Sequence, residues 1–296
     1  MSGTTQATVA VATPAFAKRK ARALIGWLTE EEGALWLAGR NQQAASDAIL
    51  IQRCRAARTA ASTRAAHTER SDTVSPLPDS LASYVAKLRS NPWGAKTIAD
   101  AGEPALVDLR YIRAMQPVVH IEDAKKRVAA VDPKDLVAIA ALSIPIPPTD
   151  LPDLQAVFDP SKQAHMMSSP NPNLRVLGQV ATMGEMGPGL RVHVFGFAVM
   201  LSTSCLNVGG VAGHYFLRDG YHRAIGFLQS GITHVPALVR QYANIQEASM
   251  PAGMLSPDVV LGDHPALLPD YCNDSVSAET MSPLVSKMVV IPRHWS

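Results

Sequence analysis

The residues of this chain that are best suited to chemistry stand together in one short run, Asp219-Gly220-Tyr221-His222-Arg223. The guanidinium of Arg223 offers a rigid fork of donors that matches phosphate oxygens, and the imidazole of His222 adds further donors. A glycine lets a bulky anion approach the backbone. We therefore predict a phosphate pocket in which Gly220, Tyr221 and Arg223 bind the ligand. His222 and Asp219 are the predicted catalytic residues, with His222 as acid or base and Asp219 orienting His222 or holding Mg²⁺.

The surrounding sequence predicts a strand, a tight turn, a helix and a second strand. Residues 214–218 are typical of a strand, Asp219-Gly220 of a turn, and residues 232–239 of the next strand. Gly231 is well placed to end the helix in the left-handed conformation. The run thus falls on the first turn of a helix, where unpaired N–H groups and the positive end of the dipole favour anions. One face of that helix is predicted to carry Tyr221, Ala224, Ile225 and Leu228.

A purely structural interpretation of the same run stays open. Asp219 would then cap the helix, a contribution of ~1 kcal/mol. Arg223 would pair with a neighbouring acid, and His222 would be a half-buried histidine with its hydrogen bonds satisfied. In that case the domain is a scaffold without a ligand.

The segment Leu217–Val239 resembles the ParB/sulfiredoxin-like superfamily. Its members share a strand ending in a D-G-x-x-R-type turn, a short helix, a G-[IV]-x-x-[IV]-P element and a closing strand. A fainter similarity covers residues 105–245, where Ser143-Ile144-Pro145-Ile146 matches the superfamily's "SI…PI" segment. The resemblance implies an α+β fold with a mixed sheet, and a nucleotide-phosphate cradle carried over to Asp219, Gly220, His222 and Arg223. It also implies ATP, ADP or CTP as ligand, with Mg²⁺, and phosphoryl transfer or phosphate-ester cleavage as chemistry.

Two departures from the superfamily narrow this implication. Sulfiredoxins place a reactive cysteine immediately before the His-Arg pair, whereas this chain has Tyr221. Cys205 lies in an apolar run, where a lowered thiol pKa is not expected, so reduction of sulfinic acids is disfavoured. Partition proteins continue into a helix-turn-helix domain, but the proline-broken region after residue 245 offers no such helices.

The alternative function is that of a non-enzymatic DNA-binding or protein-binding regulator. Residues 18–70 are predicted to be helical and carry ten Lys or Arg against five Asp or Glu, and the predicted contacts are Arg53, Arg55 and Arg58. The solvated face of amphipathic helices explains the same charges without a partner. No aromatic residues alternate with these arginines as they would on a stacking platform.

The rest of the chain sets the organisation. We predict a mobile tail at 1–17, a helical basic region at 18–104, the ParB/sulfiredoxin-like domain at 105–245 and an extended Pro-rich C-terminal arm at 246–296. A net charge of +2 over 296 residues excludes a protein that coats nucleic acid along its length. Three cysteines without a CxxC pair indicate neither a disulfide framework nor a zinc site. Residues 192–217 lack charged side chains but contain too many polar residues and glycines for a membrane span, so we expect a cytoplasmic protein.

Overall fold

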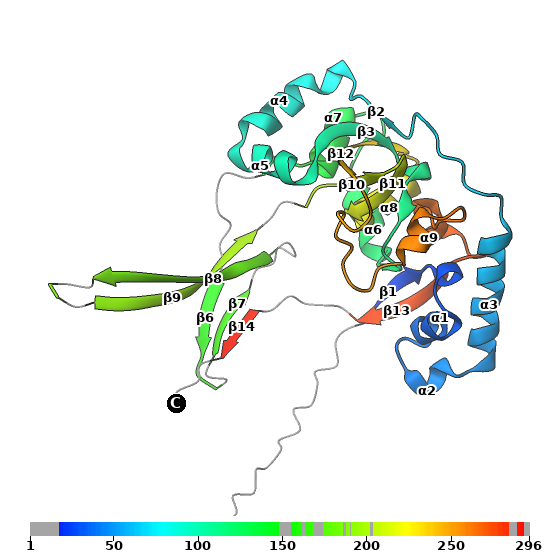
Figure 1. The fold of residues 1–296 in the computed structure, drawn as a ribbon, viewed down its shortest axis with the longest axis horizontal. Helices are drawn as coiled ribbons and strands as arrows, with labels where there is room; N and C mark the ends of the chain where they lie inside the picture. Colours follow the sequence, from blue (N-terminus) through cyan, green and yellow to red (C-terminus); the bar gives the residue numbers. More distant parts are fainter. Residues whose placement is uncertain are drawn as a thin grey trace, which may run out of the picture.

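The computed structural model describes residues 18–147, 155–161, 164–168, 174–185, 188–189, 191–201, 204–283 and 289–292 (Figure 1). The predicted tail, residues 1–17, lies outside the described residues. The fold is of the α+β class, as predicted, with helices packed around a mixed sheet. Whether this is the ParB/sulfiredoxin-like fold remains a prediction.

A six-stranded mixed sheet forms the centre of the body. In sheet order the strands are β2 (Val74–Ser75), β3 (Glu103–Asp108), β12 (His234–Tyr242), β10 (Asn207–Val211), β11 (His214–Asp219) and β4 (Arg113–Ala114). Strands β10 and β12 are parallel, as are β11 and β4, and the other neighbours are antiparallel.

Helix α8 (Tyr221–Gln229) follows β11 and packs against α6 (Glu122–Val128). Its inward face buries Ala224, Ile225 and Phe227 completely, against the equally buried Phe216 and Leu217 of β11. Gly231 takes a φ of 76° after the helix, as predicted. The strand–turn–helix–strand prediction is therefore confirmed, because the apolar spacing that marked the helix is the spacing that the core requires.

Further helices complete the body around the central sheet. Four of them precede β2, four lie between β2 and β4, and the last follows α6 along the chain (Figure 1). Their bounds are η1 (Ile25–Trp27), α1 (Glu30–Leu37), α2 (Gln42–Ala45), α3 (Ala48–Thr63), η2 (Asp79–Leu81), α4 (Ala82–Ser90), α5 (Pro92–Ala101), η3 (Leu109–Tyr111) and α7 (Leu136–Ser143).

The two ends of the described chain meet in a second sheet. Strand β1 (Lys18–Ala23) lies between β13 (Ala278–Pro283) and β5 (Val118–Val119), antiparallel to both. The prediction of helix from Lys18 is thus wrong for the first six residues and confirmed for α1 to α3. These residues form a strand because the small side chains of Ala21 and Ala23, at alternating positions, are fully buried against partner strands that are distant in sequence.

Residues 246–283 of the predicted C-terminal arm are an integral part of the body. Tyr271, in η4 (Leu268–Cys272), is fully buried and contacts Tyr221 edge-on. Within its described part the helices are short, namely α9 (Pro257–Leu261) and η4, as the proline spacing indicates. The extended arm prediction is corrected here, because Leu255, Val260 and Leu268 supply apolar surface to the main core.

An insertion between Pro147 and Ser204 carries four further strands. In Figure 1 they extend away from the body as β6 (Gln155–Asp159), β7 (Ala164–Ser168), β8 (Leu174–Glu185) and β9 (Arg191–Leu201). β7 pairs with β6 and with β14 (Val289–Pro292), whereas β8 and β9 form a hairpin.

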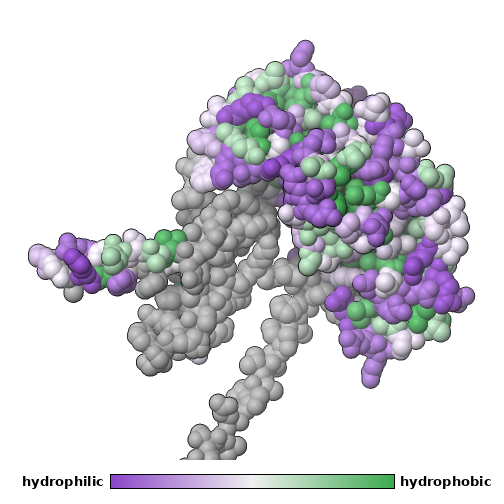
Figure 2. Space-filling view, in the orientation of Figure 1, coloured by the Kyte–Doolittle hydropathy of each residue, from purple (hydrophilic) through white to green (hydrophobic). Residues whose placement is uncertain are grey.

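Hydrophilic side chains cover most of the visible face of the body, and hydrophobic ones appear there in small separate patches (Figure 2). In the described part of the chain, no helix combines the length and apolarity that crossing a membrane requires.

Candidate functional site

The predicted site lies where β11 ends and α8 begins, and residues 219–223 are called the α8 junction below. Gly220 is the N-cap of α8, with a φ of 93° that favours glycine. A Cβ on this residue would lie 3.1 Å from the Cα of Leu206. The glycine therefore serves a left-handed turn packed against the neighbouring chain, which differs from its predicted role of opening the backbone to an anion.

Tyr221 is a structural residue of the α8 junction. Its buried hydroxyl donates to Leu217 O at 2.6 Å and accepts from the amides of Met115 at 2.8 Å and Gln116 at 3.1 Å. Burial raises the pKa of this phenol well above its usual range. The prediction that Tyr221 binds ligand is corrected for its side chain, because the ring and hydroxyl face the core.

Arg223 is buried with only 7% of its surface exposed. Its Nη1 donates to Leu142 O at 2.9 Å and Ser204 O at 2.6 Å, and its Nη2 donates to Ser204 Oγ at 2.7 Å. The guanidinium thus ties together the two chain segments between which the insertion leaves and returns. The predicted clamp of Arg223 on a phosphate is corrected, since these bonds point the fork into the protein.

The charge of Arg223 has no directly bonded counter-charge among the described residues. All three of its hydrogen bonds go to neutral oxygens. The nearest acid in the network is the exposed Asp219, whose Oδ2 accepts from Ser204 Oγ at 3.1 Å and whose Oδ1 accepts from the Gly220 amide at 2.7 Å. Burial lowers the pKa of Arg223, the nearby negative charge of Asp219 raises it, and the positive charge of Arg127 on α6 lowers it. The first turn of α8 therefore lies over a buried cation.

A histidine pair involves the first turn of α8. The rings of His222 and His120 stack with centroids 6.1 Å apart and an interplanar angle of 8°. Both residues are half-buried, and His120 Nδ1 is buried without a hydrogen-bond partner in the described structure. His120, Ser204 and Arg127 are site residues that sequence reasoning missed. His120 offered one signal, because it lies in the strand predicted just before α6.

Asp219 does not cap α8, because the N-cap is Gly220 and no side chain caps the helix. The structural interpretation of Asp219 as a cap is therefore wrong. Within the described ranges no group of three or more His, Cys, Asp or Glu side chains is placed to hold a metal ion. Mg²⁺ is often held by one or two carboxylates together with substrate phosphates, so Asp219 fits only a cation that arrives with a nucleotide.

The basic N-terminal surface is largely neutralised by acids that the local charge count did not include. Arg55 pairs at 2.9 Å with Glu30, an acid within residues 18–70. Four other basic residues of this region pair with acids that lie beyond residue 70. These pairs are Lys20–Glu279, Arg22–Asp274, Arg64–Asp270 and Arg70–Asp72. Arg53 and Arg58 remain exposed on α3. The structure thus reduces the positive patch on which the predicted DNA contact depends.

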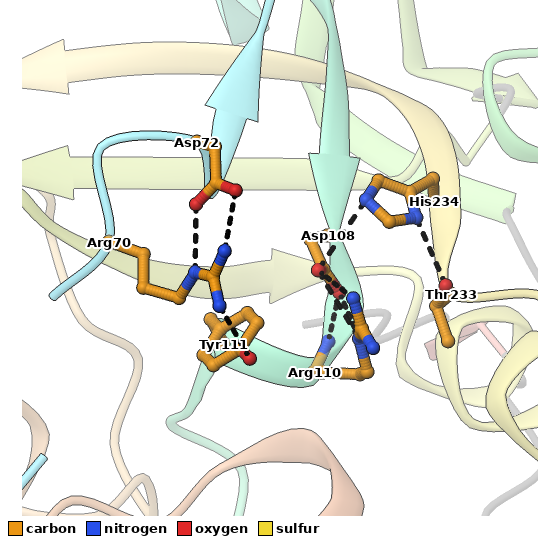
Figure 3. Close-up of polar contacts among 7 residues, drawn as sticks. All are labelled: Arg70, Asp72, Asp108, Arg110, Tyr111, Thr233 and His234. Carbon is orange, nitrogen blue, oxygen red and sulfur yellow. Dashed lines mark hydrogen bonds and ion pairs between the residues drawn. The ribbon is translucent and has the colours of Figure 1, made fainter. Parts of the chain in front are cut away.

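A second polar cluster lies where β3 ends and β12 begins (Figure 3). The exposed His234 approaches Asp108 Oδ2 at 3.5 Å, and its Nδ1 lies 3.0 Å from Thr233 Oγ1. Arg110 engages both carboxylate oxygens of Asp108. Arg110 pairs directly with Asp108 and Arg70 with Asp72, so the charges in this cluster are balanced by direct ion pairs. At the α8 junction, Arg223 reaches Asp219 only through Ser204 Oγ among the described residues.

One cavity of the body lies away from the predicted site, and none of the predicted site residues lines it. That cavity has a volume of about 400 Å³ and is lined in part by Trp27, Trp36, Arg40, Pro117 and Met254.

Comparison of the chain with protein-family models, curated proteins and solved structures gave no match. The resemblance to the ParB/sulfiredoxin-like superfamily therefore remains a prediction that depends on Leu217–Val239.

Proposed function

We propose that this protein binds a phosphate-bearing small molecule at the α8 junction, with ATP, ADP or CTP as the first candidates. The observation that carries this proposal is the buried Arg223, whose three hydrogen bonds all go to neutral oxygens. A cation held under the first turn of a helix adds to the positive end of the helix dipole. Such a place attracts an anion even though the guanidinium does not touch it.

The structure changes the roles proposed for individual residues. His222, half-buried at the first turn of α8, is the side chain that we assign to ligand contact, with the exposed Arg127 adding charge from α6. Gly220 and Tyr221 shape the turn, and their backbone faces the same helix end. Asp219 would hold the Mg²⁺ of a bound nucleotide. Should the site be catalytic, His222 is the acid or base of phosphoryl transfer or phosphate-ester cleavage.

A thermal-shift panel tests this proposal. ATP, ADP, CTP and GTP are each added with and without Mg²⁺ to the wild type, to His222→Ala and to His234→Ala. At ~100 times the dissociation constant a ligand adds ~2.7 kcal/mol to the free energy of unfolding, which raises the midpoint visibly. We expect the shift in the wild type and in His234→Ala, the matched control from the second cluster, and its loss in His222→Ala. No shift with any ligand, or equal shifts in both variants, would contradict the proposal.

A further inference from the structure

The β8–β9 hairpin is a sheet of only two strands, of 12 and 11 residues. It lies apart from the body in Figure 1. A two-stranded sheet is at best marginally stable in water, and three or more strands are normally required. Two of its described side chains are apolar and well exposed, Val180 at 48% and Met183 at 71%. Among the described residues no third strand joins the hairpin, which therefore has the features of a sheet that another strand completes.

The outer edge of β9 is the side on which another strand fits. Among the described residues β9 pairs with β8 alone. Soluble proteins protect such edges with charges, prolines or bulges, yet residues 192–201 contain no charged residue and no proline. The irregularity in this hairpin, between Val176 and Gly178, lies on β8. The β9 edge is thus long, uncharged and regular.

Gly196, at the midpoint of β9, points to a close neighbour outside the chain. A glycine inside a strand often marks a position where another backbone approaches closely. The φ of Gly196 is not in the left-handed region, so its backbone does not require glycine. A Cβ built on it meets no atom within 4 Å in the described structure. Neither reason for a glycine is therefore found among the described residues.

We propose that two copies of this protein associate by pairing their β9 strands antiparallel, with the two-fold axis at Gly196. The result is a continuous four-stranded sheet in which β9 of each copy is central and β8 is at the edge. Full overlap of the strands places Arg191, the charged residue of β9, opposite Leu201 of the second copy. No like charges then meet across the interface, and a self-complementary contact of this kind closes as a dimer. This inference is independent of the proposed ligand.

Charge substitutions at the axis test this dimer directly. Gly196→Lys and Gly196→Glu each have room in the single chain, but each places its charge opposite an identical charge in the pair. Molar mass is measured by light scattering across a dilution series for the wild type, for both variants and for their mixture. We expect a dimer for the wild type and a dissociation constant raised about tenfold or more in each variant alone. The equimolar mixture should recover the dimer, because Lys then faces Glu.

Thr182→Lys is the matched control, since it adds the same charge to the exposed face of β8, away from the axis. It should leave the dissociation constant within about twofold of the wild type. A wild type that is monomeric at every concentration would overturn the proposal. So would a Gly196→Lys variant that dimerises as well as the wild type, or a Lys–Glu mixture that stays monomeric although both variants are folded by circular dichroism.

Discussion

Two buried arginines in this protein occupy opposite electrostatic situations. Arg113, on β4, is 1% exposed and donates to Glu69 Oε1 at 2.8 Å, as well as to the carbonyls of Val260 and Gly262. Arg223 is 7% exposed and, among the described residues, donates only to carbonyl and hydroxyl oxygens. The comparison separates an arginine that is bonded directly to a carboxylate from one that reaches its nearest acid, Asp219, through Ser204 Oγ. In the function that we propose, only the second arginine contributes to the attraction of an anion.

The largest effect is expected where a buried pair is broken. Arg113→Met leaves the Glu69 carboxylate without its main partner, and removing one partner of a buried pair typically costs ~3–5 kcal/mol. Urea unfolding should show this loss. The double variant Arg113→Met/Glu69→Gln should recover a large part of it, because no buried charge is left. If the unfolding free energy of Arg113→Met lies within about 1 kcal/mol of the wild-type value, the Arg113–Glu69 pair does not stabilise the fold as expected here.

Arg223→Met should destabilise the protein less than Arg113→Met. It leaves the Leu142 and Ser204 carbonyls without their donor but strands no carboxylate, so a cost of ~1–3 kcal/mol is expected. The variant should also lose affinity for phosphate ligands, because the buried charge is gone. If its urea stability falls further than that of Arg113→Met, the contrast between the two arginines is wrong.

Tyr221→Phe removes a buried hydroxyl that serves three backbone groups. The amides of Met115 and Gln116 then lose their acceptor, at an expected cost of ~1–2 kcal/mol in urea unfolding. Phosphate binding to the folded protein should be unchanged, since this side chain faces the core. A loss of binding with unchanged stability would restore Tyr221 to the list of ligand contacts.

The smallest effect is the pH dependence of stability that arises from His67, which lies beside Glu69 and Arg113. Burial lowers the pKa of His67 from its ordinary value of 6.5, Arg113, Arg64 and His214 act in the same direction, and Glu69 opposes them. The unfolded chain therefore takes up this proton at higher pH than the folded one. Stability from His67 is present above about pH 6.5 and is lost as the pH falls below it, by at most ~1.4 kcal/mol per pH unit.

His67→Phe isolates this contribution. It replaces the imidazole by a ring that cannot titrate. The slope of the unfolding free energy against pH should therefore become shallower between about pH 6.5, the ordinary pKa of histidine, and about pH 5. Chemical denaturation at several pH values measures the slope. A slope identical to that of the wild type would assign the acid sensitivity to other groups.

Local spacing in the sequence predicts part of this structure. The helix face of Ala224, Ile225 and Leu228 and the left-handed Gly231 follow from periodicity and turn chemistry alone. What it missed depends on partners distant in the chain. Arg223 donates a hydrogen bond to Leu142 O, 81 residues earlier in the chain. Strand β1 pairs with β13, which lies some 260 residues later. A residue type shows which bonds a side chain can make, whereas the tertiary fold decides whether those bonds face solvent or protein.

The most direct measurement is a ¹⁵N chemical-shift titration of the protein with inorganic pyrophosphate. We expect the largest, saturable shifts at the amides of Tyr221 and His222, with those of Thr233 and His234 in the charge-balanced cluster nearly unmoved. Shifts that are absent at the α8 junction, or that concentrate instead around Arg53 and Arg58 on α3, would contradict an anion site over the buried Arg223.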